Sequence, residues 1–176
     1  AWTLTEVSFT DGPYLATNST DTTLTPQQTG TGTGKTITAS AITGINGGVG
    51  WLATDVGRIL KFNSGKAIIT ARTNATVAVA TITTAFTNTD ATAAFNLGAF
   101  SNTTGFPSCV SFFEQRLVFA GTTDEPQTLY FSKSGDYENM TTGTNADDAM
   151  VYTIASNQVN KIRYLKAVRT LLIGTT

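Results

Sequence analysis

Residues 110–122 read VSFFEQRLVFAGT, and residues 162–175 repeat the same pattern as IRYLKAVRTLLIGT. Each segment holds an apolar stretch, a short charged stretch with an arginine, a second apolar stretch and then Gly-Thr. The second copy begins 52 positions after the first (162 against 110), and its glycine lies 53 positions after Gly121. Apolar runs on either side of a short turn are typical of β-hairpins, so the sequence predicts two related hairpins.

Two further strand candidates lie between the copies, at residues 127–132 (QTLYFS) and 150–155 (MVYTIA). With them the repeat holds four antiparallel strands, and its period is close to the roughly 50 residues of some β-propeller blades. We therefore predict one and a half propeller-like blades over residues 105–176, with Arg116 and Arg169 at matching turn positions. Because a propeller needs about four to eight blades to close, the chain is expected to be a fragment, or to obtain its missing strands from elsewhere.

The first part of the chain divides into three segments. Residues 1–15 include a loose period-two alternation at residues 2–9 (WTLTEVSF), which predicts a strand of a preceding blade. Residues 16–36 are mostly Thr, Asn, Gln and Gly, and are expected to form a linker or loop. Residues 37–104 alternate short strand candidates with Gly- and Asn-containing turns. We predict a small β-sandwich or barrel here, inserted between blades.

The composition supports an all-β fold and excludes several functional classes. About one residue in five is Thr, which favours strands. The chain has no His and a single Cys, Cys109, which excludes His-dependent catalysis, His-ligated metal sites and an intrachain disulfide framework. The net charge is −1 in 176 residues, which argues against a dedicated nucleic-acid binder. No apolar run is long enough to suggest a membrane span.

Motifs that could carry chemistry are weak. The stretch GTGTGKT at residues 30–36 lacks the first glycine of a phosphate-binding loop, because that position is Thr29, and a β-forming segment follows it. Three acidic pairs fall in turn-like segments, and we expect these segments to be solvated loops. Catalysis by a pair of carboxylates, or a bound Ca²⁺, stays open as an alternative. The pairs are Asp124 with Glu125, Asp136 with Glu138, and Asp147 with Asp148. We predict no enzyme activity, no cofactor and no metal site.

Aromatic side chains follow the predicted blade strands, and packing between blades accounts for them without a ligand. They are Phe112, Phe113, Phe119, Tyr130, Phe131 and Tyr164. Trp2 and Trp51 are expected to anchor loops, whereas an exposed Trp51 would suggest a sugar-stacking site.

Four of the eleven basic residues are concentrated within nine positions of the second hairpin. They are Lys161, Arg163, Lys166 and Arg169. On a regular strand Lys161 and Arg163 share one face, and Lys166 lies near the turn. A solvated face is the default expectation. A channel-facing patch that meets DNA, or an interface with acids of a neighbouring blade or subunit, is also compatible with the pattern.

Several short strings, taken in order, resemble landmarks of one phage protein family. They are FTDGPY (9–14), TDVGR (54–58), FFEQRL (112–117) with FAG (119–121), SKSGDYEN (132–139), IASNQV (154–159) and LLIG (171–174). Together they resemble the nozzle proteins, or tail tubular protein B-like proteins, of short-tailed bacteriophages and related prophage structural proteins. The resemblance runs from about residue 2 to residue 176 and is weakest over residues 60–100.

The resemblance implies a structural component of the virion, made in the bacterial host cytoplasm and built into the phage tail. Members of the family form a hexameric ring below the portal and adaptor, and the genome is retained by this ring and leaves through it. The implied partners are further copies of the chain, the tail adaptor, other tail proteins and, transiently and without sequence specificity, phage DNA. The alternative is a tail-associated binding module, in which residues 37–104 recognise a host glycan or another tail protein.

Overall fold

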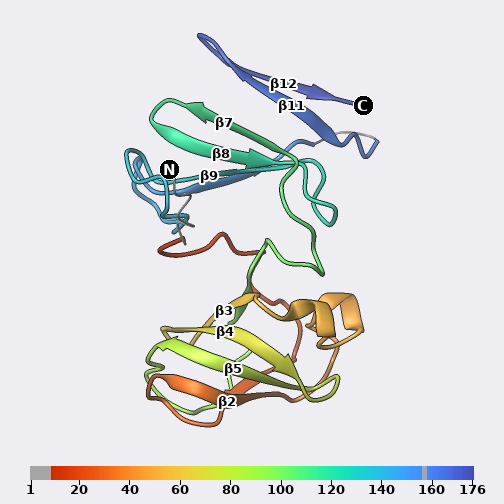
Figure 1. Ribbon diagram of the computed structural model, residues 1–176, viewed down its shortest axis with the longest axis vertical. Helices are drawn as coiled ribbons and strands as arrows, with labels where there is room; N and C mark the ends of the chain where they lie inside the picture. Colours follow the sequence, from red (N-terminus) through yellow and green to blue (C-terminus); the bar gives the residue numbers. More distant parts are fainter. Residues whose placement is uncertain (1–8, 156–157) are drawn as a thin grey trace, which may run out of the picture. The chain divides into compact units, whose positions relative to one another are not determined.

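The computed structural model describes residues 9–155 and 158–176, and it is nearly all β (Figure 1). The chain divides into two compact units. Unit 1 consists of two segments of the chain, the one that ends at Pro13 and Thr104–Thr176. Unit 2 is the segment between them, Tyr14–Thr103. The strand expected at residues 2–9 lies, except for Phe9, outside the described residues.

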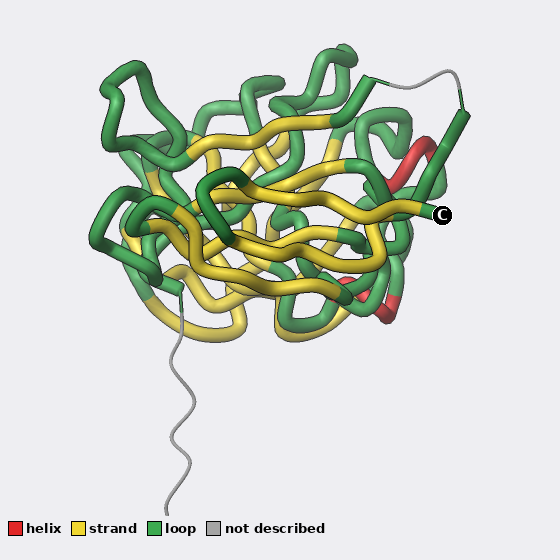
Figure 2. The backbone as a smooth tube through the Cα atoms, turned by 90° about the horizontal axis from the view of Figure 1, so that it is seen from above, coloured by secondary structure: helices red, strands yellow, loops and turns green. Residues whose placement is uncertain are grey.

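Unit 2 is a single antiparallel six-stranded sheet that curls into a half-barrel, so the expected small barrel forms as an open one. The strand order is β1-β2-β5-β4-β3-β6. The strands are β1 (Leu24–Pro26), β2 (Gly32–Ala39), β3 (Ile59–Phe62), β4 (Gly65–Arg72), β5 (Val77–Thr84) and β6 (Asn96–Leu97). Two short 3₁₀ turns, η1 (Asn46–Gly48) and η2 (Ala53–Asp55), are the helical segments drawn in red in Figure 2.

The expectation of a linker over residues 16–36 is wrong. Strand β1 and the first part of β2 lie within this segment, and unit 2 begins at Tyr14 rather than at residue 37. Leu24 is fully buried and pairs with Ala39 of β2, and Pro26 of the same strand is also buried, so two apolar side chains anchor the segment. Threonine is polar but favours strands, so a Thr-rich strand lacks the alternation of apolar and polar residues by which strands are recognised in a sequence.

The core of unit 2 follows the two-residue period of its strands. Inward positions on β5 and β4 are small or aliphatic, as at Ala78, Ala80, Ile82 and Ile69. Larger side chains from the other strands and the loops complete the core: Leu24, Ile37, Leu60, Phe62, Trp51, Phe86 and Phe95.

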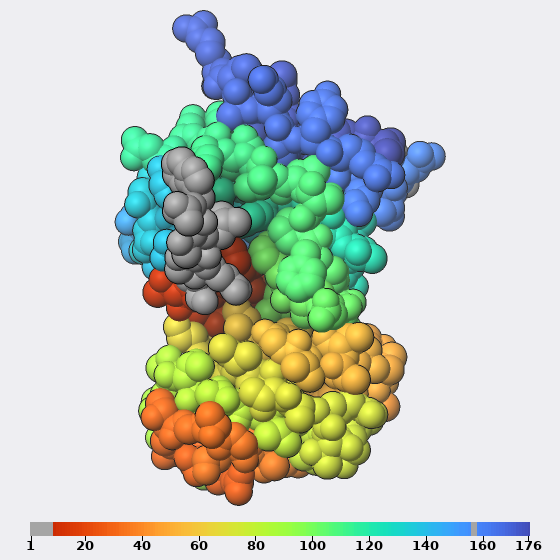
Figure 3. All heavy atoms as spheres, viewed as in Figure 1, coloured from red at the N-terminus to blue at the C-terminus, as the bar shows by residue number. Residues whose placement is uncertain are grey.

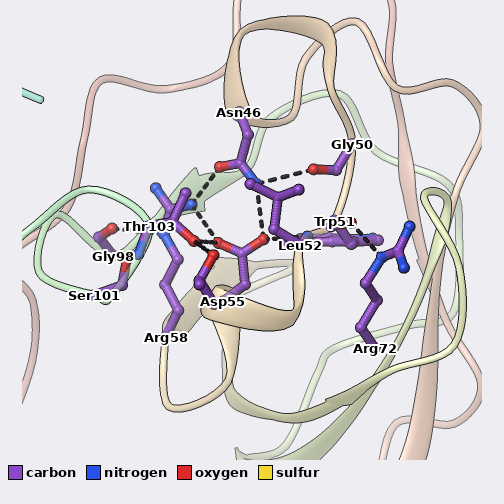
Figure 4. Close-up of polar contacts among 11 residues, drawn as sticks. Asn46, Gly50, Trp51, Leu52, Asp55, Arg58, Arg72, Gly98, Ser101 and Thr103 are labelled. Atoms are coloured by element: carbon purple, nitrogen blue, oxygen red, sulfur yellow. Dashed lines mark hydrogen bonds and ion pairs between the residues drawn. The ribbon is translucent and has the colours of Figure 1, made fainter.

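A buried polar network holds the loops at one end of this half-barrel (Figure 4). Asp55 Oδ1 and Arg58 Nη1 form an ion pair at 3.0 Å, and their side chains are 0% and 1% exposed. Asn46 bridges the pair, because its Nδ2 donates to Asp55 Oδ2 at 2.7 Å and its Oδ1 accepts from Arg58 Nη1 at 2.6 Å. Thr103 Oγ1 donates to Asp55 Oδ1 at 2.7 Å, and Arg58 Nε donates to the Gly98 carbonyl at 2.8 Å. The network therefore ties η1 and the segment after β6 to η2.

Unit 1 contains the predicted blade. Its four-stranded sheet has the order β10-β9-β8-β7, which is an antiparallel meander of consecutive strands. The strands are β7 (Cys109–Phe113), β8 (Arg116–Ala120), β9 (Thr128–Phe131) and β10 (Met150–Thr153). The second hairpin also forms, from β11 (Ile162–Ala167) and β12 (Leu171–Thr175). Unit 1 thus contains a four-stranded antiparallel sheet of the propeller-like kind, followed by the separate two-stranded sheet β11–β12.

The turns of the two hairpins differ in length. Glu114 and Gln115 form a two-residue turn with φ of 47° and 58°, which is the left-handed geometry of a type I′ turn. In the second hairpin Ala167 pairs with Leu171, which leaves three residues in the turn. The offset between the copies grows from 52 to 53 across these segments.

The second hairpin packs against the first through an apolar core. Cys109, Val118, Ala120, Leu129 and Ile162 are buried together, and the half-buried side chains around them include Phe113, Phe131, Leu165 and Leu171. The chain approaches closely at Gly121, where a Cβ atom would lie 2.7 Å from the Ile162 carbonyl oxygen and φ is +76°. Only glycine accommodates both conditions without strain.

The two arginines of the repeat have different surroundings. Arg116 is the first residue of β8 and is 7% exposed. Its guanidinium donates to the carbonyls of Ser132 and Asp148, both at 2.7 Å, and of Ala146 at 2.6 Å. Arg169 lies within the three-residue turn of the second hairpin and is exposed. Arg116 thus fastens the long β9–β10 connection, a role that Arg169 does not have.

Replacing Asp55 by Ala is expected to destabilise unit 2 by about 3–5 kcal/mol, because it leaves the buried Arg58 charge without its carboxylate. The control is Asp90→Ala, which removes an exposed carboxylate of the same unit and should cost less than about 0.5 kcal/mol. Urea unfolding followed by tryptophan fluorescence measures both. Equal losses in the two variants would contradict a structural role for the network.

Arg116→Lys is expected to lower the free energy of unfolding by about 1–3 kcal/mol, because one ammonium group cannot reproduce the planar fork that serves three carbonyls. Arg169→Lys makes the same chemical change at the exposed, repeat-related position and should change the stability by less than about 0.5 kcal/mol. Thermal unfolding by circular dichroism compares the two variants. A larger effect at Arg169 would overturn the assignment.

Candidate functional site

The four basic residues singled out from the sequence all lie on or beside the second hairpin. Arg163 and Lys166 are exposed on β11, and Arg169 is exposed in the turn. Lys161 immediately precedes β11 and is half-buried, with its carbonyl accepting the Thr176 N–H at 3.2 Å. Residues 158–176 contain no Asp or Glu, so the charge of this hairpin is uniformly positive. Figure 3 shows the hairpin, in the darkest blue, at the surface of the molecule.

A β-bulge between Ile162 and Tyr164 changes the expected alternation. Ile162 is buried before the bulge, and Leu165 and Ala167 are half-buried after it. Arg163 and Tyr164 between them are both exposed, as is Lys166. An extra residue in one strand allows two consecutive side chains to leave on the same side. The bulge therefore gathers more side chains on the solvent face than a regular strand would. We call this face of β11–β12 the basic hairpin face.

The second surface lies on the blade itself. Val110, Phe119, Tyr130 and Val151 pair in register across all four strands, so they share the face opposite the core. Tyr130 is buried, whereas Val110 is 59% and Val151 is 45% exposed. Phe112, in the next row of this face, is also 59% exposed.

Two aromatic side chains from outside the sheet lie against the same face. The ring of Phe9 meets Phe119 edge-on with centroids 5.8 Å apart, and the ring of Tyr137 meets Phe112 edge-on at 5.0 Å. We call this surface the outer apolar face; it comprises Phe9, Val110, Phe112, Phe119, Tyr137 and Val151. Of the six aromatics expected to pack between blades, Phe112 and Tyr164 are instead exposed, at 59% and 60%.

The acidic pairs lie in two places: Asp124 and Glu125 lie near Tyr130, whereas Asp136, Asp147 and Asp148 lie around Lys133. Glu125 accepts a hydrogen bond from the Tyr130 hydroxyl, and burial and this contact raise the pKa of Tyr130 above its usual range. Asp148 is mostly buried, contrary to the expected solvated loop, because it accepts the Asn145 N–H and pairs with Lys133 Nζ, both at 3.0 Å. These contacts hold the pKa of Asp148 below its usual value. Among residues 9–155 and 158–176 there is no group of three potential metal-ligating side chains.

Unit 2 offers little for a bound ligand. Trp51 is fully buried within the core of unit 2, whereas we expected it to anchor a loop, and it cannot stack on a sugar. The Gly-rich stretch that resembles a phosphate loop leads into strand β2, and not into a helix whose N-terminus could face a phosphate. In the described part of the chain, no helix is long and apolar enough to cross a membrane.

An open hollow of about 560 Å³ lies beside the edge strand β10, and its walls are mostly apolar. The lining residues are Phe131, Thr142, Gly143, Ala149, Met150, Val151 and Tyr152. The lining includes no carboxylate or cation, so the hollow has no group suited to acid–base chemistry.

The sequence indicated the basic hairpin face but not the outer apolar face or the role of Arg116. The exposure of Val110 and Phe112 depends on which side of the sheet the second hairpin covers, and no local pattern contains that information. Comparison with known protein families and with curated proteins finds no match to this chain.

Proposed function

We propose that this chain is a structural part of the tail of a short-tailed bacteriophage and that it assembles with further copies of itself. In this proposal it forms part of a ring, hexameric in the whole protein, through which the genome is retained and ejected. The tail adaptor and other tail proteins are its neighbours, and its contact with DNA is transient and non-specific. The chain is made in the bacterial cytoplasm and ends in the virion.

The observation that carries the proposal is the outer apolar face of a propeller-like blade. The other face of the same sheet packs against β11–β12 through Ile162, Leu165 and Leu171 and stays open only at β10, whereas Val110 and Phe112 are more than half exposed. Contiguous apolar surface of this kind is uncommon on monomers and marks interaction sites. A further sheet packed here would continue the arrangement that β11–β12 begins, and a neighbouring subunit can supply it. The order of the landmark strings supports the phage family.

The arrangement of the acidic residues supports a non-catalytic role. Glu125 is engaged by Tyr130 and Asp148 by Lys133, while Asp136 and Glu138 are exposed in a loop. A glycan hydrolase needs two carboxylates facing one another across a cleft. The binding-module alternative loses its clearest candidate with the burial of Trp51.

Val110→Lys is expected to weaken self-association by about tenfold or more, because it places a charge within an apolar contact. Light scattering over a concentration series measures the change as a lower mass at each concentration. Val49→Lys is the matched control, since Val49 is 58% exposed against 59% for Val110 but lies in unit 2. Circular dichroism confirms that both variants are folded.

Two results would contradict the proposal. One is a wild-type chain that stays at its 18.5 kDa monomer mass over the whole concentration range. The other is self-association that Val110→Lys and Val49→Lys weaken equally, because the contact would then not involve the outer apolar face.

A further inference from the structure

The outer apolar face corresponds, within the repeat, to the side of the second hairpin that is buried. Val110 and Ile162 begin the two copies of the repeat, and Ile162 is fully buried against the blade whereas Val110 is 59% exposed. Two positions after Val110, Phe112 lies on the same face. Because the bulge adds one residue to β11, its counterpart is Leu165, which packs against the core of the blade. The outer apolar face therefore lacks the sheet that its repeat-related surface has.

The solvent side of the second hairpin is the surface that the propeller pattern assigns to a further blade. Tyr164 and Lys166 pair with Gly174 and Leu172 across the hairpin, so these four residues share this side. Tyr164 is 60% and Leu172 is 51% exposed. The Tyr164 ring occupies the space above Gly174, because a Cβ atom added to this glycine would collide with it. The basic hairpin face thus also presents an apolar surface to solvent.

The two hairpins of unit 1 run in the same direction (Figure 1). Cys109 begins β7 and Ile162 begins β11, and the Cys109 Sγ atom lies 3.7 Å from the Ile162 carbonyl oxygen. The β7–β8 and β11–β12 turns consequently lie at the same end of the packed sheets. A blade added on the solvent side of β11–β12 by the same step would have its own β7–β8 turn at this end too.

Negative charges border the outer apolar face at its turn end. Tyr137, whose ring meets Phe112, lies in a loop that is joined to the β7–β8 turn, because the Gly135 N–H donates to the Gln115 carbonyl at 2.8 Å. Three exposed carboxylates lie in this turn and beside Tyr137. We call them the acidic rim; they are Glu114, Asp136 and Glu138.

Positive charges border the basic hairpin face. Lys166 lies beside Leu172 near the end of β11, and Arg169 lies in the β11–β12 turn. Both are exposed, as is Arg163 in the bulge. Among residues 9–155 and 158–176, no carboxylate forms an ion pair with any of these three cations. The two surfaces therefore carry opposite charges, and the turn of each lies at the same end.

We propose that copies of this chain associate head to tail, with the outer apolar face of one copy packed against the basic hairpin face of the next. The contact repeats the step by which β11–β12 pack on the blade, and it brings the acidic rim to Lys166 and Arg169. Each copy uses two different surfaces, so the contact is heterologous and can close into a ring. The inference rests on the proposed function, to which it adds the surface that the outer apolar face receives.

Pairing of two outer apolar faces is the other arrangement that a second copy permits. That contact would bring two acidic rims into one interface, where like charges repel, and would leave the basic hairpin face unused. The strand predicted for residues 2–9 lies, except for Phe9, outside the described residues, and one strand can cover only part of a face that four strands form.

The experiment is a mixing test read by size-exclusion chromatography with light scattering. Leu172→Glu alters the basic hairpin face and Val110→Lys alters the outer apolar face, and each variant alone should associate about tenfold more weakly than the wild type. An equimolar mixture should form a species with the mass of two chains. The intact hairpin face of one variant meets the intact outer face of the other, and the two altered surfaces stop further growth.

Val56→Glu is the matched control for Leu172→Glu, because Val56 is 45% exposed but lies in unit 2, and it should associate as the wild type does. Lys166→Glu provides a second, milder test of the same face, and circular dichroism shows which variants are folded. It should weaken association severalfold at about 50 mM NaCl and have little effect at about 500 mM, where the charges are screened.

The inference would be overturned if Val110→Lys weakened association while Leu172→Glu and Lys166→Glu behaved as the wild type. The proposed function would then survive, with two outer apolar faces paired. A mixture of folded Val110→Lys and Leu172→Glu chains that gains no mass would also overturn the head-to-tail contact. A wild-type chain that stays monomeric contradicts the proposed function itself, so the two failures are distinguishable.

Discussion

The packing of β11 against β7 determines which surfaces of unit 1 are covered and which stay open. Ile162 is fully buried between the hairpins, and Leu165 and Leu171 cover the core side of the blade. This contact depends on the close approach of the chain at Gly121. Because a strand presents alternate side chains to opposite faces, covering one face leaves the other to solvent. Both surfaces that we connect with function, the outer apolar face and the basic hairpin face, are consequences of this one contact.

Few charges are available to this chain, and two of its arginines are used inside the fold. Arg58 joins Asp55 and Asn46 beneath the loops of unit 2, and Arg116 collects three carbonyls from the β9–β10 connection. In both places the guanidinium group donates hydrogen bonds to backbone or side-chain oxygens of a loop. Without these donors, the oxygens would be buried with no hydrogen-bond partner. Arg163, Lys166 and Arg169 of the second hairpin stay exposed at the surface, while Lys161 is half-buried.

The sequence predicted the strands of unit 1 well, because the apolar runs around residues 110–122 and 162–175 are strong and repeated. It failed over residues 16–36, where β1 is rich in polar neighbours and only its two buried residues, Leu24 and Pro26, anchor it. It could not distinguish buried Arg116 from exposed Arg169, since both follow an apolar strand. The bulge that exposes both Arg163 and Tyr164 also has no local signature, because it depends on the register of β12.

A tail component built from propeller-like blades must meet its neighbours through defined faces, so that copies close into a ring and do not grow as an open chain. Electron microscopy of negatively stained particles, at a concentration where the mass exceeds that of a monomer, tests this claim most directly. The account predicts closed rings with a constant number of subunits, six if the resemblance to nozzle proteins holds. Open filaments, irregular aggregates or isolated single chains at that concentration would contradict it.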